Sequence, residues 1–197
     1  MKKEEAKQKT IASLLKIARK HFTDQGYYDA SLEEIAEEGN VTRGAVYHHF
    51  KNKKGLFLAV LDKVQADVAR QIEEEAMNST DLWEQLILGS VGFVKGANTK
   101  ESRRILLTDA PVVVGWEAWR KADQENSMGV LQKHLDELKE EGYLKENTET
   151  KLMTYAISGA LNELALNYST NKAEAYDQKV YETISQMVGG FRKTSSK

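Results

Sequence analysis

Residues 31–53, SLEEIAEEGNVTRGAVYHHFKNK, constrain the fold more than any other part of this chain. They predict two short helices joined by a tight turn. Ser31 and Glu34 have the spacing of a capping box, in which each side chain bonds a free backbone N–H at the start of a helix. Gly39 and Asn40 break this helix, and Asn tolerates a left-handed turn conformation better than most residues. The first helix is therefore expected at about residues 32–38.

The second helix is expected at about residues 43–49, with Thr42 as its N-cap. Its inward side can be formed by Ala45, Val46 and Phe50. The side chains left outside are Arg43, Gly44, Tyr47, His48 and His49. A helix that is too short to be a core element, with hydrogen-bond donors on its free face, suits the major groove of DNA. The alternative for Tyr47 is that it only covers the small core.

These residues resemble the TetR family of bacterial transcriptional regulators. The family pattern has a hydroxyl-capped helix with Ile-Ala, a small-Gly-Val-Ser/Thr turn, then Gly-x-x-Tyr-x-x-Phe and Asn-Lys-x-x-Leu. The matching residues are Ser31, Ile35, Ala36, Gly39, Asn40, Val41, Thr42, Gly44, Tyr47, Phe50, Asn52, Lys53 and Leu56. One departure is Gly39-Asn40, where the family has Ala-Gly. The resemblance covers about the first third of the chain, and implies a helix-turn-helix head joined to a helical body that binds a small molecule and dimerises.

The DNA contacts expected from this pattern differ in chemistry. Arg43 is the candidate base reader, because its fork can grip O6 and N7 of guanine. Lys53, at the start of the next helix, is placed to hold a phosphate together with free backbone N–H groups. His48 and His49 are adjacent, so they diverge around the helix and cannot chelate a metal together; no metal or cofactor is expected. The full predicted DNA-binding set is Ser31, Thr42, Arg43, Gly44, Ala45, Tyr47, His48, His49 and Lys53.

Composition and charge agree with an all-α chain that has a phosphate-binding end. The 197 residues include one proline and no cysteine, which excludes disulfides and thiolate metal sites and fits a reducing cytoplasm. Neither a signal peptide nor a membrane span is expected. Residues 1–55 contain 11 Lys/Arg and 8 Asp/Glu, whereas the remaining 17 and 22 make residues 56–197 acidic. A basic end on an acidic body favours nucleic acid as the partner of that end.

Helical periodicity predicts about nine or ten helices in two domains. The helix-turn-helix domain is expected at residues 1–52, followed by a connecting helix at 53–77. An effector-binding and dimerisation domain is expected at residues 78–197. The interrupted segment around Pro111 predicts a helix break there, because proline suits a first helical turn better than an interior position.

Two sets of residues are candidates for the work of the body domain. An apolar effector pocket could be lined by Phe93, Leu107, Trp116, Trp119, Met128 and Tyr155, although core packing explains these residues equally well. The last two helices, near residues 148–168 and 173–191, are apolar on most sides and are expected to pair with a second copy in a four-helix bundle. The alternative is that both are internal to one larger core. The predicted dimer residues are Leu152, Tyr155, Ala156, Leu161, Leu164, Tyr176, Val180, Ile184, Met187 and Phe191.

Together these features predict a cytoplasmic, homodimeric transcriptional regulator that represses genes at a palindromic operator and is released by a small molecule. An architectural or cell-division DNA-binding protein without an effector is the alternative. An enzyme is not favoured, because the sequence contains no nucleophile–base pair, metal set or phosphate-binding loop.

Overall fold

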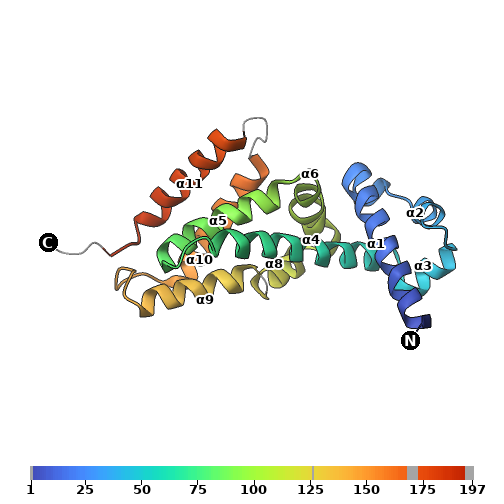
Figure 1. Ribbon diagram of the computed structural model, residues 1–197, viewed down its shortest axis with the longest axis horizontal. Coiled ribbons are helices and arrows are strands. Elements are labelled where there is room, and N and C mark those ends of the chain that lie inside the picture. The colour runs from blue at the N-terminus through green and yellow to red at the C-terminus, as the bar shows by residue number, and fades with distance from the viewer. Residues whose placement is uncertain (1, 126, 168–172, 194–197) are drawn as a thin grey trace. The chain divides into compact units, whose positions relative to one another are not determined.

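The computed structural model describes residues 2–125, 127–167 and 173–193 and is built of helices (Figure 1). The all-α prediction is confirmed. The elements are α1 (Lys2–Asp29), α2 (Leu32–Glu38), α3 (Arg43–Phe50), α4 (Lys53–Ala76), α5 (Leu82–Asn98), α6 (Lys100–Ser102), the π-helix η1 (Arg103–Asp109), α7 (Ala110–Val114), α8 (Trp116–Glu125), α9 (Ser127–Glu140), α10 (Thr150–Asn167) and α11 (Ala173–Gly189). In the described part of the chain, no helix is long and apolar enough to cross a membrane.

The chain divides into two compact units. The head unit comprises residues 1–66 and 100–115, and the body unit comprises residues 67–99 and 116–197. This division differs from the predicted one, because the segment 100–115 groups with the N-terminal helices although it lies far along the sequence.

The head unit has a small core at the meeting point of four apolar helix faces. Phe22 on α1, Ile35 on α2, Val46 on α3 and Phe57 on α4 are all at most 1% exposed. The rings of Phe22 and Phe57 meet edge to face with their centroids 5.2 Å apart, which is a favourable aromatic geometry. This core fixes the position of α3, whose single fully buried residue is Val46.

Helix α1 has a kink at Gly26 near its C-terminal end, which the helical periodicity of the sequence did not predict. Gly26 has φ +81° and ψ 170°, a backbone conformation that glycine adopts without steric cost, and one more helical turn follows it. The kink interrupts the helical hydrogen bonds, and the N–H of Tyr27 instead donates to Oδ2 of Asp109 at 2.8 Å. A residue on α1 thus depends for its hydrogen bond on a side chain 82 positions away.

The segment of α6, η1 and α7 is held to α1 by further polar contacts. Arg19 pairs with Glu101 at 2.6 Å, and Lys100 pairs with Asp24 at 2.6 Å. Residues Arg103–Asp109 of this segment form a π-helix, whose wider turn is uncommon and often marks a functional position. Asp109 lies at its C-terminal end and is 8% exposed.

The body unit is built around one hydrophobic core shared by α5, α9, α10 and α11. Leu135, Met153, Ile157 and Ile184, which come from three of these helices, are each at most 1% exposed. Helix α5 begins at the N-cap Asp81, whose Oδ1 accepts the N–H of Glu84 at 2.8 Å. The carboxylate of Glu84 in turn accepts the hydroxyl of Tyr181 on α11 at 2.8 Å, so a capping position also ties two helices together.

Candidate nucleic-acid interface

The turn between α2 and α3 has the geometry that its sequence predicts. Ser31 Oγ accepts the N–H groups of Glu33 and Glu34 at 3.2 and 3.4 Å, which caps α2. Only this half of the predicted capping box is present among the described contacts, because Oε2 of Glu34 accepts Nε2 of Gln25 at 3.5 Å instead of the N–H of Ser31. Asn40 has φ +50°, in the left-handed region that Asn tolerates. Thr42 Oγ1 accepts the N–H of Ala45 at 3.2 Å and caps α3. These local hydrogen bonds fix the direction in which α3 leaves the turn.

Helix α3 presents one side of its first turns to solvent. Thr42, Arg43 and Gly44 are exposed, Ala45 and His49 are half-buried, and His48 is exposed. Tyr47 is 38% exposed and its hydroxyl accepts from Arg43, so it lies at the surface rather than covering the head core. A Cβ at Gly44 would have only Thr42 Oγ1 near it, at 3.8 Å, so no neighbouring protein group requires glycine there.

The guanidinium of Arg43 is held between two helices. Its Nη1 lies 2.6 Å from Oε1 of Glu33 on α2, and its Nη2 donates to the hydroxyl of Tyr47 at 3.1 Å. The guanidinium carbon is 5.2 Å from the centroid of the Tyr47 ring. The sequence pattern did not reveal this pair, because the two residues lie ten positions apart and on opposite sides of the turn.

Lys53, the predicted phosphate contact, also has protein partners. Its Nζ donates to the backbone carbonyl of Tyr28 at 2.8 Å and lies 4.9 Å from the centroid of the Tyr27 ring. Partial burial lowers the pKa of Lys53, and the nearby carboxylates of Asp29 and Glu33 act against this shift. An ammonium group has three donors, so two remain for a phosphate after the bond to Tyr28.

The rings of the two adjacent histidines, His48 and His49, lie against each other on α3. Their rings stand nearly perpendicular, with centroids 5.2 Å apart. In the part of the chain that the structure describes, no group of three or more His, Cys, Asp or Glu side chains is arranged to hold a metal ion. A hydrogen bond to DNA from His48, which is exposed, or from His49, which is half-buried, stays a prediction.

The predicted effector-pocket residues do not form one uniform set. Phe93 packs against the core of the body unit, and Met128 and Trp119 are buried at 3% and 6% exposure. Trp116 is 62% exposed and its ring lies 5.1 Å from that of Trp119. Tyr155 is half-buried, and Leu107 belongs to the head unit. The residues around Trp119 in the body unit therefore remain the candidates for a ligand.

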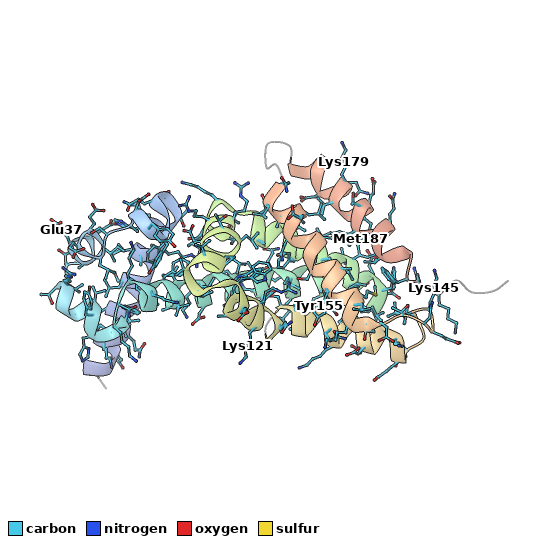
Figure 2. The ribbon with its side chains drawn as sticks, turned by 180° about the vertical axis from the view of Figure 1, so that it is seen from behind. Glu37, Lys121, Lys145, Tyr155, Lys179 and Met187 are labelled. Carbon is cyan, nitrogen blue, oxygen red and sulfur yellow. The ribbon has the colours of Figure 1, made fainter. Side chains whose placement is uncertain are left out.

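The predicted dimer residues also separate into two groups. Leu161, Val180 and Ile184 are at most 5% exposed because they pack in the core of a single protomer, so we remove them from the predicted interface. The residues Leu164, Met187 and Phe191 are partly buried against the same core. Leu152 is 65% exposed and Ala156 is exposed on α10, while the side chain of Tyr176 lies outside the described residues. Figure 2 labels Tyr155 on α10 and Met187 on α11, the two helices concerned.

Two unpaired polar atoms in the body unit were not found from the sequence. The indole Nε1 of Trp119 and the Oδ2 atom of Asp123 are buried without a hydrogen-bond partner among the described residues. Burial raises the pKa of Asp123, with the nearby Arg120 acting in the opposite direction. The guanidinium of Arg120 lies 5.8 Å from the Trp116 ring and 5.9 Å from the Tyr155 ring. The i, i+4 spacing of Trp119 and Asp123 indicates that they share one side of a helix, but no pattern in the neighbouring sequence indicates that both side chains are buried.

The head unit thus contains a helix-turn-helix whose second helix has a capped, exposed start carrying an arginine, which defines a DNA-binding protein of the helix-turn-helix class. Two family models match the chain. Residues 14–60 match the model "Bacterial regulatory proteins, tetR family", and residues 83–191 match "Tetracyclin repressor-like, C-terminal domain". The chain belongs to the TetR family of transcriptional regulators.

Known proteins agree with this assignment. The chain is 34% identical over 106 residues to the HTH-type transcriptional regulator AcrR of Shigella flexneri, a match that spans 53% of this chain and 49% of AcrR. A TetR-family transcriptional regulator from Pectobacterium atrosepticum is 26% identical with a TM-score of 0.74, and the match covers 95% of this chain and 96% of that one. AibR, solved in complex with isovaleryl coenzyme A and operator DNA, shares the fold at 18% identity with a TM-score of 0.67, over 90% of this chain and 97% of its own.

Proposed function

We propose that this TetR-family regulator is a homodimeric repressor that binds a palindromic operator and is released by a small-molecule effector. The observation that carries the DNA-binding part is the start of α3, where Arg43 is exposed at the N-terminal end of a helix that Thr42 caps. In helix-turn-helix proteins this end of the recognition helix contacts the base edges, and a bidentate arginine recognises guanine.

The dimer is supported by the surface of α10. Leu152 and Ala156, one helical turn apart, are exposed although both are apolar. A second copy packed along this helix would bury them by the symmetric contact that most homodimers use. Such a dimer must place its recognition helices about 34–36 Å apart, or a multiple of this, to reach successive major-groove faces of one DNA side.

Footprinting on the DNA upstream of the protein's own gene tests this proposal. We expect one protected site with inverted half-sites about 10 base pairs apart, centre to centre, bound by two chains. Mass determination in solution gives the number of chains independently of DNA. A monomer in solution and on DNA would contradict the dimer. Weak protection spread over unrelated sequences would instead favour an architectural DNA-binding protein.

The effector part rests on the unpaired atoms of α8. Buried polar groups are almost always hydrogen-bonded, so a bound ligand could supply the hydrogen bonds that Trp119 Nε1 and Asp123 Oδ2 lack among the described residues. The indole requires an acceptor, and an ionised carboxylate requires a donor. The aromatic pair of Trp116 and Trp119 would lie beside such a ligand. We therefore propose a planar, largely apolar effector that carries both an acceptor and a donor. The AibR structure, which contains both a ligand and operator DNA, is a precedent within the fold.

Ligand binding can be measured by thermal shift with a library of such compounds, followed by operator release. Trp119→Phe removes the indole donor while retaining an aromatic ring, and Asp123→Asn removes the charge. We expect both variants to keep the fold and to lose the shift that an active compound causes. A compound that releases the operator from both variants as well as from the unmodified protein would exclude α8 as its site. If no compound in a broad library affects operator binding, the effector-free alternative is favoured.

A further inference from the structure

Glu33 on α2 forms an ion pair with the exposed start of α3, and it belongs to a chain of contacts. Its Oε2 accepts the hydroxyl of Ser31 at 3.1 Å, and its Oε1 lies 2.6 Å from Nη1 of Arg43. Arg43 in turn donates to the hydroxyl of Tyr47. The chain Ser31–Glu33–Arg43–Tyr47 therefore runs from the N-cap of α2 to the second turn of α3 and contains the candidate base reader.

Stability does not account for this arrangement. The side chains of Arg43 and Glu33 are 60% and 57% exposed, and solvent-exposed ion pairs contribute little to the free energy of folding. The position is also unfavourable for DNA binding in general, because a carboxylate beside a helix that enters the major groove would repel the phosphates of the duplex. What the contact does provide is a restricted position for a long and flexible side chain. Fixing such a side chain before binding removes part of the entropy loss that binding would otherwise cause.

We propose that Glu33 is a positioning residue that holds the Arg43 guanidinium in place for one base pair and so increases sequence specificity at the expense of general DNA affinity. On an operator with the matching base, a prepositioned Arg43 gains a bidentate contact that outweighs the repulsion between Glu33 and phosphate. On random DNA this gain is missing, and Glu33 only repels the duplex and keeps Arg43 away from the phosphates. This inference rests on the proposed operator binding.

The test compares Glu33→Gln with a matched control on the same helix. Glutamine keeps the size of the side chain and removes the charge that holds Arg43. Glu37, labelled in Figure 2, is exposed one turn further along α2, and its carboxylate makes no ion pair or hydrogen bond within the described residues. Glu37→Gln therefore changes the net charge of α2 by the same amount without releasing Arg43.

The quantity to measure is the ratio of the dissociation constants for random and operator DNA, taken over a series of salt concentrations. We expect Glu33→Gln to bind random DNA several-fold more tightly, with a salt slope steeper by about 0.9, as for one additional phosphate contact. Operator affinity should not rise, and the loss of prepositioning should weaken it by about 2- to 10-fold. The ratio should then fall about tenfold or more. Glu37→Gln should shift both constants in the same direction and leave the ratio nearly unchanged.

A double-mutant comparison shows whether Glu33 acts through Arg43. In an Arg43→Ala background, Glu33→Gln should no longer change the ratio, because no guanidinium remains to be positioned. An equal fall in the ratio for Glu33→Gln and Glu37→Gln, or an unchanged ratio in Glu33→Gln, would overturn the inference while leaving operator binding intact. If the unmodified protein binds operator and random DNA equally, the proposed function and this inference fail together.

Discussion

Replacing Asp109 should destabilise the head unit through a hydrogen bond to a backbone 82 positions away. Its Oδ2 accepts the N–H of Tyr27 at 2.8 Å and lies 3.2 Å from Nε of Arg104. A hydrogen bond to a charged group is worth roughly 1.5–3 kcal/mol, and an unpaired, partly buried N–H costs a similar amount. Arg104 is 43% exposed, so its ion pair adds at most about 1 kcal/mol. We therefore expect Asp109→Ala to lower the free energy of unfolding by roughly 2–4 kcal/mol.

Two further variants separate the backbone bond from the ion pair. Asp109→Asn keeps an oxygen acceptor for the N–H of Tyr27 but removes the charge, and should cost about half as much as Asp109→Ala. Arg104→Ala removes only the ion pair and should cost at most about 1 kcal/mol. Because the chain has two compact units, a global transition alone does not show which unit is affected. Amide hydrogen exchange at Tyr27 supplies the local measurement, since its protection depends on Asp109.

The expected order of cost is Asp109→Ala, then Asp109→Asn, then Arg104→Ala, with faster exchange at Tyr27 only in the first two. If Asp109→Ala costs no more than Arg104→Ala, the backbone hydrogen bond contributes nothing and the reasoning is refuted. Unchanged protection of the Tyr27 amide in Asp109→Ala would lead to the same conclusion.

Other perturbations of the two units give equally direct predictions. Gly44→Ala should raise the free energy of unfolding by about 0.5–1 kcal/mol, because no neighbouring atom crowds the added Cβ, but the methyl group should weaken operator binding by keeping α3 away from the DNA backbone. Gly55→Ala should lower the free energy of unfolding by about 3 kcal/mol, measured by denaturant unfolding, because its Cβ would lie 1.9 Å from the carbonyl oxygen of Phe50. Equal stability of the two variants would contradict this contrast. Burial raises the pKa of Asp123, so the folded protein holds this proton at a pH where the unfolded carboxyl, near 3.8, has lost it. The ionised form therefore costs stability at neutral pH, and the cost is relieved as pH falls toward that value. Asp123→Asn should raise the melting temperature near neutral pH by an amount that shrinks toward about pH 4, whereas a gain independent of pH would exclude titration of this group as the cause. Lys53→Ala should weaken operator and random DNA alike and reduce the salt slope of both by about 0.9; an effect confined to the operator would show that Lys53 does more than bind phosphate.

The helix-turn-helix could be predicted from the sequence because its determinants are local. The caps Ser31 and Thr42 act within three residues, and the left-handed turn at Asn40 depends on one residue type. Of the three residues predicted on the inward side of α3, Val46 is buried at 1% exposure, whereas Ala45 and Phe50 are half-buried. Short-range rules therefore suffice for this part of the molecule.

The parts that could not be predicted depend on contacts distant in sequence. Periodicity identified α10 and α11 as apolar, but it cannot tell which neighbour covers each face, so Leu161, Val180 and Ile184 were assigned to a dimer although they fill the protomer core. The π-helix Arg103–Asp109 has no compositional signal, and its Asp109 has its main partner on α1. Both cases follow from tertiary packing, which overrides local pattern.

Contacts that are distant in sequence also limit how well the net charge of residues 1–55 predicts affinity for DNA. Residues 1–55 carry an excess of three positive charges, but two of the cations expected at DNA already have protein partners. Arg43 is paired with Glu33, and Lys53 donates to the carbonyl of Tyr28. On random DNA the Glu33 carboxylate offsets part of the attraction of Arg43 for phosphate, and Lys53 has two of its three donors left for a phosphate while it holds the carbonyl of Tyr28. Counting basic residues overstates general affinity for this reason. The salt dependence per head should accordingly be smaller than the number of lysines and arginines around α3 implies, and a larger share of the operator's advantage should come from base contacts.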